Sequence, residues 1–230
     1  MKKLTAALAL LLLTTSCGKG REDGLVARWT FDERAAETVM DASGNGNDGA
    51  LANGGYDAGL LGSALKLDGS DDSVMRVAVS ESLKATRKEI TVAAWAYRTE
   101  GRNVAIVAHG YPTLFLGYHG MQFKWQISLD NGRSGVCYAD PAYKADLQRW
   151  QHVAATYSGW VARLYVDGQE ICNDWTWGAI RMPDVPFTVG AYLDDDGTII
   201  DEMNGLIDDV RIYSRALSTE EIRELSDMGH

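Results

Sequence analysis

The stretch from Gly205 to Tyr213 reads Gly-Leu-Ile-Asp-Asp-Val-Arg-Ile-Tyr and alternates with the period of two that an extended strand requires. One face of this strand would carry Leu206, Asp208, Val210 and Ile212, and the other Ile207, Asp209, Arg211 and Tyr213. Asp208 is therefore predicted on the side where Val210 and Ile212 indicate a core. A buried carboxylate needs a cation, a metal ion or several N–H donors. The strand thus predicts a β-sheet protein with a candidate metal ligand.

The same alternation recurs along the chain. It predicts strands at 25–31, 90–98, 121–129, 150–157 and 161–166, with shorter ones at 65–67, 74–79, 104–108, 113–118 and 187–189. Asn131-Gly132 and Asp167-Gly168 are strong hairpin signals. Many short strands joined by such turns predict an all-β fold, a two-sheet antiparallel β-sandwich of the jelly-roll type.

A short helix is expected at the C-terminus. Ser218-Thr219-Glu220-Glu221 has the pattern of a capping box, in which the Ser218 hydroxyl and the Glu221 carboxylate satisfy opposite N–H groups. Ile222 and Leu225 would share one face of this helix, because they are three residues apart.

The N-terminus has the features of an export signal. Two lysines precede an apolar run at 4–13, which is too short to span a bilayer as a stable helix, and small polar residues lead to Cys17. This resembles a bacterial lipoprotein signal, in which the cysteine becomes the acylated N-terminus after cleavage, although Thr14 stands where such signals usually carry leucine. An ordinary secretory signal that leaves Cys17 as a free thiol is the alternative.

This signal defines the expected organisation of the chain. We expect a signal peptide over 1–16, a flexible tether over 17–24 and one domain over 25–230. By the same resemblance, Gly18 after Cys17 favours the outer membrane. The predicted location is the cell envelope of an exported protein whose only membrane contact is its lipid anchor.

The charge of the chain restricts its partners. The sequence has 22 basic and 32 acidic residues, a formal charge of −10, and loss of Lys2 and Lys3 with the signal leaves 20 against 32, or −12. Such a surface argues against nucleic acid and anionic lipid, and is compatible with neutral ligands, cations or cationic partners.

Cys137 and Cys172 remain after Cys17 is set aside. Both stand at the ends of apolar, strand-like stretches in a chain that is expected to reach an oxidising compartment. A disulfide between them is the first interpretation, and two buried thiols in unrelated strands are the alternative.

The order of several phrases along the chain is recognisable. They are Leu25-Val-Ala-Arg-Trp-Thr-Phe-Asp-Glu33, Asp41-Ala-Ser-Gly-Asn-Gly-Asn-Asp-Gly49, Gly62-Ser-Ala-Leu-Lys-Leu-Asp-Gly69, Ile90-Thr-Val-Ala-Ala-Trp95, Trp150-Gln-His-Val-Ala-Ala-Thr-Tyr157, Leu164-Tyr-Val-Asp-Gly168 and the strand that ends at Tyr213. Together they resemble the laminin-G-like, concanavalin A-like lectin/glucanase jelly-roll family over nearly all of 25–225. The resemblance implies a two-sheet sandwich and, commonly, a structural calcium ion at one edge. It implies no single activity, because the family includes lectins, accessory domains of glycosidases and adhesion modules.

The resemblance also implies which residues would hold calcium. Asp208 matches the acid of the last strand and Asp32 the acid that ends the first, while Ser43, Asn45 and Asp48 would supply oxygens from a Gly-rich loop. The alternative is a tight turn at 41–49, with Asp208 bonded to nearby backbone amides.

Catalysis is not expected, although the sequence leaves it open. Retaining glycosidases need two carboxyl groups close together, and the central predicted strands at 90–98 and 150–157 carry no acid. His152 lies in a framework phrase of the family, where a structural imidazole is the simpler interpretation.

Binding fits the sequence better. Seven tryptophans and ten tyrosines give the chain many aromatic faces, which can stack on the apolar faces of sugar rings. Those in loop-like places are Tyr111, Tyr118, Tyr143, Trp160, Trp175 and Trp177. Trp175 and Trp177 would lie on one side of an extended segment and, with Tyr111 and Tyr143, are the predicted ligand-binding residues. A loop packed over the sheet edge is the alternative.

The sequence therefore predicts a non-catalytic surface lipoprotein that binds carbohydrate or glycoprotein through a calcium-stabilised jelly roll. The alternatives are a module that docks a protein of an envelope complex and, less favoured, a glycoside hydrolase.

Overall fold

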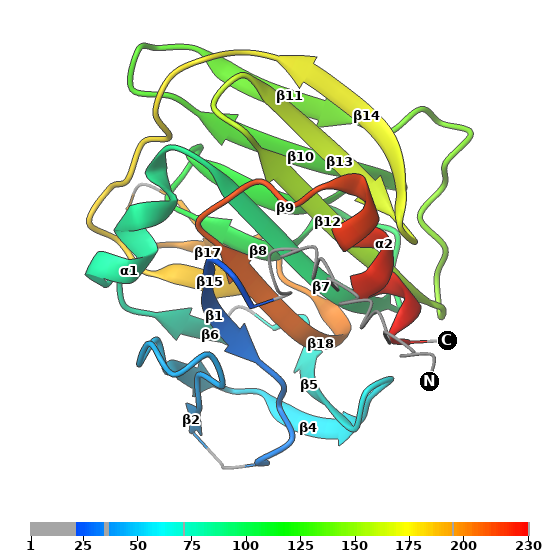
Figure 1. Cartoon of the computed structure of the whole chain (residues 1–230). Coiled ribbons are helices and arrows are strands. Elements are labelled where there is room, and N and C mark those ends of the chain that lie inside the picture. Colours follow the sequence, from blue (N-terminus) through cyan, green and yellow to red (C-terminus); the bar gives the residue numbers. More distant parts are fainter. Residues whose placement is uncertain (1–21, 35–36, 71, 195, 230) are drawn as a thin grey trace, which may run out of the picture.

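The computed structural model describes residues 22–34, 37–70, 72–194 and 196–229, which form a sandwich of two antiparallel sheets (Figure 1). Sheet A contains β1 (Leu25–Trp29), β4 (Gly55–Ala58), β5 (Ser63–Asp68), β7 (Ile90–Arg98), β12 (Trp150–Tyr157), β13 (Val161–Val166), β14 (Gln169–Trp175) and β18 (Asn204–Tyr213). Sheet B contains β2 (Thr38–Val39), β3 (Gly49–Ala52), β6 (Val74–Val77), β8 (Val104–His109), β9 (Leu114–His119), β10 (Gln122–Ser128), β11 (Ser134–Tyr138) and β15 (Phe187–Val189). The predicted jelly-roll class is confirmed.

The strand orders explain how distant segments meet. Sheet A runs β14-β13-β12-β7-β18-β5-β4, with β1 also paired to β18, and sheet B runs β11-β10-β9-β8-β15-β6-β3-β2. A small hairpin of β16 (Tyr192–Leu193) and β17 (Ile199–Ile200) packs on β8 and β9 through Tyr192, Ala108 and Phe115. A short helix α1 (Glu81–Lys84) continues into the 3-10 helix η1 (Ala85–Arg87).

A β-bulge in β18 corrects the predicted faces of that strand. Asp208 pairs with Trp95 and Arg211 with Ala93, so Asp209 and Val210 together face only Ala94. Asp209 has a φ of 43°, the left-handed conformation that such a bulge can use. The extra residue shifts the alternation by one position.

The bulge moves Asp208 off the core side. Ile207, Val210 and Ile212 all join the core between the sheets. Asp208 pairs directly with Trp95 of β7. Trp95 shares a face of β7 with Ala93, two residues away, and Ala93 packs under α2 on the outer face of sheet A. Asp208 therefore lies on that outer face. The prediction that Asp208 shares a face with Val210 and Ile212 is wrong, although Asp208 is fully buried.

The C-terminal helix α2 (Thr219–Asp227) covers that outer face (Figure 1). The predicted capping box is present, and Ile222 and Leu225 are both buried against sheet A. The Arg215 guanidinium binds the Glu221 carboxylate and holds the pKa of that carboxyl at about 2.

The described part of the chain begins with residues that were expected to belong to a flexible tether. Ser214 N–H donates to the Gly24 carbonyl at 2.8 Å, and Arg215 Nε donates to the Asp23 carbonyl at 2.7 Å. These residues are fixed on the domain. The predicted signal peptide and Cys17 lie outside the described residues. Within the described residues, no helix has the length and apolar character needed to cross a membrane.

The predicted disulfide joins the two sheets at one edge. Cys137 lies on β11 and Cys172 on β14, with their Cα atoms 5.7 Å apart. The bond therefore ties β14, the outermost strand in the order of sheet A, to β11, the outermost strand of sheet B.

Candidate functional site

Two exposed indoles mark the end of β14. Trp175 is 73% exposed and Trp177 is 47% exposed, whereas Thr176 between them is buried. The predicted placement of both indoles on one side of an extended segment agrees with this alternation. Exposure at this level shows that Trp175 does not pack over the sheet edge as a core residue does.

The backbone that carries Trp175 is held firmly against sheet B. Besides the disulfide at Cys172, the Asp174 Oδ2 accepts a hydrogen bond from Val136 N–H at 3.0 Å. Thr176 packs so closely on Gly135 that a Cβ there would lie 3.0 Å from the threonine methyl. The strand end is therefore preorganised, and a ligand would not need to order it.

Trp177 is oriented by the turn between β10 and β11. The Arg133 guanidinium lies 3.6 Å from the centre of a Trp177 ring, and Asn131 Nδ2 donates to the Trp177 carbonyl at 2.6 Å. Arg133 thus occupies one face of Trp177, and the residue remains half-exposed. The sequence carried no signal for Arg133, because Arg133 and Trp177 are far apart in the chain and meet only in the folded structure.

Trp160 adds a third exposed indole nearby. It is 66% exposed, and its carbonyl accepts a hydrogen bond from Thr176 N–H at 3.1 Å. It was noted in the sequence as a loop aromatic but not counted among the predicted ligand residues. Trp160, Trp175 and Trp177 are together called the indole edge.

The other predicted ligand residues lie elsewhere. Tyr143 is half-exposed in a polar depression of about 380 Å³, where Arg149 pairs with both Asp146 and Asp167. Tyr118 was interpreted as a loop residue, but it is a core residue of β9 whose ring lies 4.2 Å from the guanidinium of buried Arg98.

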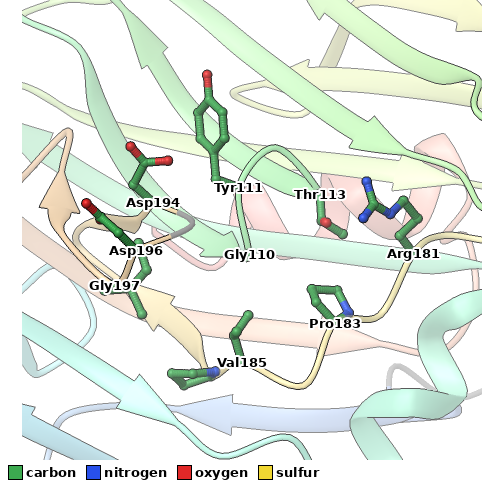
Figure 2. Close-up of a pocket in the computed structure, with 11 residues that line it drawn as sticks. Gly110, Tyr111, Thr113, Arg181, Pro183, Val185, Asp194, Asp196 and Gly197 are labelled. Atoms are coloured by element: carbon green, nitrogen blue, oxygen red, sulfur yellow. The ribbon is translucent and has the colours of Figure 1, made fainter.

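Tyr111 lines a pocket of about 360 Å³ (Figure 2). Its walls come from the β8–β9 turn, the segment before β15, and the turn between β16 and β17. Figure 2 shows Asp194 and Asp196 on one side of this pocket and Arg181 on the opposite side, with Tyr111 between them. Asp194, Asp196 and Gly197 lie in the turn of the β16–β17 hairpin, where Asp196 and Gly197 are exposed, and form one side of this pocket.

The predicted calcium ligands fall into two groups. Ser43 Oγ donates to the Val26 carbonyl, Asn45 Nδ2 donates to the Leu25 carbonyl, and Asp48 Oδ1 accepts from the backbone N–H of Asp41. These contacts place that group at the start of β1, within a loop bonded to itself as the tight-turn alternative describes.

Asp32 and Asp208 both bind the turn between β4 and β5. Asp32 Oδ1 accepts from Ser63 N–H at 2.9 Å, and Asp208 Oδ2 accepts from the N–H groups of Leu60 and Leu61 at 2.9 and 2.8 Å. Among the described residues, no three His, Cys, Asp or Glu side chains gather closely enough to hold a metal ion by themselves. A cation here would therefore also need backbone carbonyls or water.

The second carboxylate oxygen of Asp208 differs from the first. This oxygen, Oδ1, is buried and has no hydrogen-bond partner. Burial raises the pKa of the Asp208 carboxyl to about 6, against the lowering effect of the backbone amides of Leu61, Asp209 and Leu60. A buried carboxylate oxygen without a donor fits a bound cation.

The fold and the exposed aromatic edge define a lectin-like jelly-roll domain. Residues 68–223 match the Laminin_G_3 family model, described as the concanavalin A-like lectin/glucanases superfamily, and the chain belongs to that family. No curated protein matches the chain in sequence.

Solved structures show the same fold at low sequence identity. The binding domain of Paraclostridial Mosquitocidal Protein 1 is 17% identical with a TM-score of 0.73, over 90% of this chain and 53% of that one. Domain 4 of AbnA, a GH43 extracellular arabinanase from Geobacillus stearothermophilus solved with arabinotriose, is 19% identical with a TM-score of 0.67, over 88% and 98%. The binding domain of botulinum neurotoxin DC in complex with SialylT is 14% identical with a TM-score of 0.69, over 91% and 52%. The chain spans about half the length of the two toxin domains.

Proposed function

We propose that this domain binds carbohydrate through the indole edge and catalyses no reaction. The observation that carries the proposal is the exposure of Trp175, 73%, on a strand fixed by a disulfide and by the Asp174–Val136 hydrogen bond. A rigid aromatic side chain offers a large apolar contact at little cost in conformational entropy.

The surroundings of the indoles suit sugar hydroxyls. Asn173 lies two residues before Trp175, on the same face of β14, and Arg133 stacks on Trp177. An amide can donate and accept hydrogen bonds and a guanidinium can donate them, as hydroxyl ligands require. The complexes of related folds with arabinotriose and SialylT support a glycan ligand for this class of domain.

Replacing Trp175 by alanine should weaken glycan binding about tenfold or more, because the stacking face is lost from a side chain that is mostly exposed and outside the core. A glycan array with residues 22–230, followed by calorimetry on the strongest hit, measures this. Tyr143→Ala is the matched control, since Tyr143 is an exposed aromatic residue that lies in a separate depression. Equal loss in both variants, or a blank array with folded protein, would count against the indole edge and favour protein docking.

We propose further that the site of Asp208 binds a structural calcium ion. Asp208 and Asp32 would supply carboxylate oxygens there, and the buried, unpartnered Oδ1 of Asp208 supports the proposal. The ion would offset the charge of a carboxylate that burial disfavours. Melting temperatures with calcium and with chelator measure its presence.

We propose that Cys17 anchors the protein by a lipid in the cell envelope. Cys17→Ser should then abolish incorporation of labelled palmitate in a bacterial host and move the protein from the membrane to the soluble fraction. Cys137→Ala with Cys172→Ala is the control, because it removes the other cysteines and keeps the signal. Palmitate label retained by the Cys17→Ser variant would contradict the proposal of a lipid anchor at Cys17.

A further inference from the structure

One extended segment connects the indole edge with the pocket at Tyr111. The chain leaves β14 at Trp175 and crosses to sheet B, where Asp130 N–H donates to the Ala179 carbonyl and Arg181 N–H donates to the Ser128 carbonyl, both at 2.9 Å. Figure 1 shows this yellow segment descending along the left of the view from β14 to β15. Its course is therefore fixed by sheet B.

The segment presents its exposed side chains at alternate positions. Trp175, Trp177 and Arg181 are exposed, Ala179 is half-buried, and Thr176 and Ile180 are buried. The sequence of outward groups is thus two indoles, a methyl group and a guanidinium. Ala179, between Trp177 and Arg181, carries only a methyl group, and the path between those two residues is at most about 14 Å between Cα atoms.

Arg181 is also a wall of the pocket at Tyr111. Pro183 and Val185 supply apolar surface to this pocket, and Asp194 and Asp196 lie across from Arg181 (Figure 2). A volume of about 360 Å³ is within the range of small-ligand sites. The segment therefore ends at a cavity that has an aromatic ring, apolar walls, and both positively and negatively charged side chains.

We infer that this pocket is a second subsite of the carbohydrate-binding surface and receives a neutral sugar unit from a chain that lies along Trp175 and Trp177. The inference rests on the proposed function and adds the length and charge class of the ligand. Ring hydroxyls can accept from Arg181 and donate to Asp196, so a neutral unit can use both walls of the pocket. An acidic sugar could pair only with Arg181 and would be repelled by Asp194 and Asp196, and an amino sugar could pair only with those carboxylates and would be repelled by Arg181.

The test compares short and long ligands. Neutral arabino-, cello- and laminari-oligosaccharides, each as disaccharide and hexasaccharide, are titrated by calorimetry into the wild type, Arg181→Gln and Asp196→Asn. An acidic and an amino-sugar hexasaccharide are titrated into the wild type for comparison. We expect the hexasaccharide of the preferred series to bind more tightly than the disaccharide, and each variant to lose about tenfold for the hexasaccharide only. Arg223→Gln is the control, because Arg223 is an exposed helix residue that pairs with Glu220.

The outcomes separate this inference from the proposed function. Equal affinity of both lengths for the wild type, or unchanged hexasaccharide binding in both pocket variants while Trp175→Ala abolishes it, overturns the second subsite alone. No binding of any series to folded wild-type protein overturns both. Tighter binding of an acidic or an amino-sugar hexasaccharide than of its neutral counterpart overturns the assigned ligand class.

Discussion

Replacing both Cys137 and Cys172 by alanine should lower the free energy of unfolding by about 4 kcal/mol, the entropic value for a loop of the 35 residues that separate them. The disulfide closes this loop between β11 and β14, and its loss frees the unfolded chain. We expect the double variant to stay folded, because the central core, with Trp29 and Trp125, lies in other strands.

Urea unfolding monitored by circular dichroism measures the change, and Cys17→Ser is the control. Because the bond also fixes the strand that carries Trp175, the Val136 amide, which donates to Asp174, should exchange faster in the double variant. Equal stability of the oxidised and reduced wild type would contradict the prediction and favour two buried thiols.

Calcium should raise the stability of the wild type, and Asp208→Asn should abolish that response. A calcium concentration one hundred times the dissociation constant would contribute about 2.7 kcal/mol. In chelator, Asp208→Asn should be more stable than the wild type. A pKa of about 6, against 3.8 for an ordinary aspartate, means that ionised Asp208 destabilises the fold at pH 7 by about 3 kcal/mol, and the isosteric amide removes that charge.

The sign of this effect follows from proton linkage. Because the pKa of Asp208 is raised in the folded state, its contribution to stability is present below about pH 4 and is lost as the pH rises through about 6. Burial lowers the pKa of His109 to about 4, so His109 changes stability in the opposite direction over the same range. The difference between the wild type and Asp208→Asn isolates the Asp208 contribution.

Melting temperatures between pH 4 and 8, with calcium and with EDTA, measure both effects. Asp57→Asn is the control, since Asp57 is an exposed acid paired with Lys66. Identical wild-type melting curves with calcium and with EDTA would falsify the metal site.

The central strands could be predicted from sequence because local alternation and burial agree in them. The predicted ranges 90–98, 150–157 and 161–166 coincide with β7, β12 and β13. The strand β14 was not predicted, because it is polar and half-exposed at the end of its sheet. Contacts with β11 of the other sheet determine which of its residues are covered, and the local sequence does not show those contacts. The four residues of α1 are too few to show a helical period.

The candidate site divides in the same way. The sequence identified Trp175 and Trp177, because a tryptophan pair beside Asn173 and Asp174 is unusual for a core. It could not show that Tyr111 and Arg181 share a pocket, since three separate segments form its walls.

The sequence by itself determined the class of fold, the hairpin turns and the helix cap, because each depends on residues close together in the chain. Only the tertiary structure decided the face of Asp208, because a bulge depends on what pairs opposite it in β7. It also decided which aromatic residues are exposed. Exposure is the result of packing between segments far apart in sequence, so the local pattern pointed to Trp175 and Trp177 but could not show that Tyr118 lies in the core.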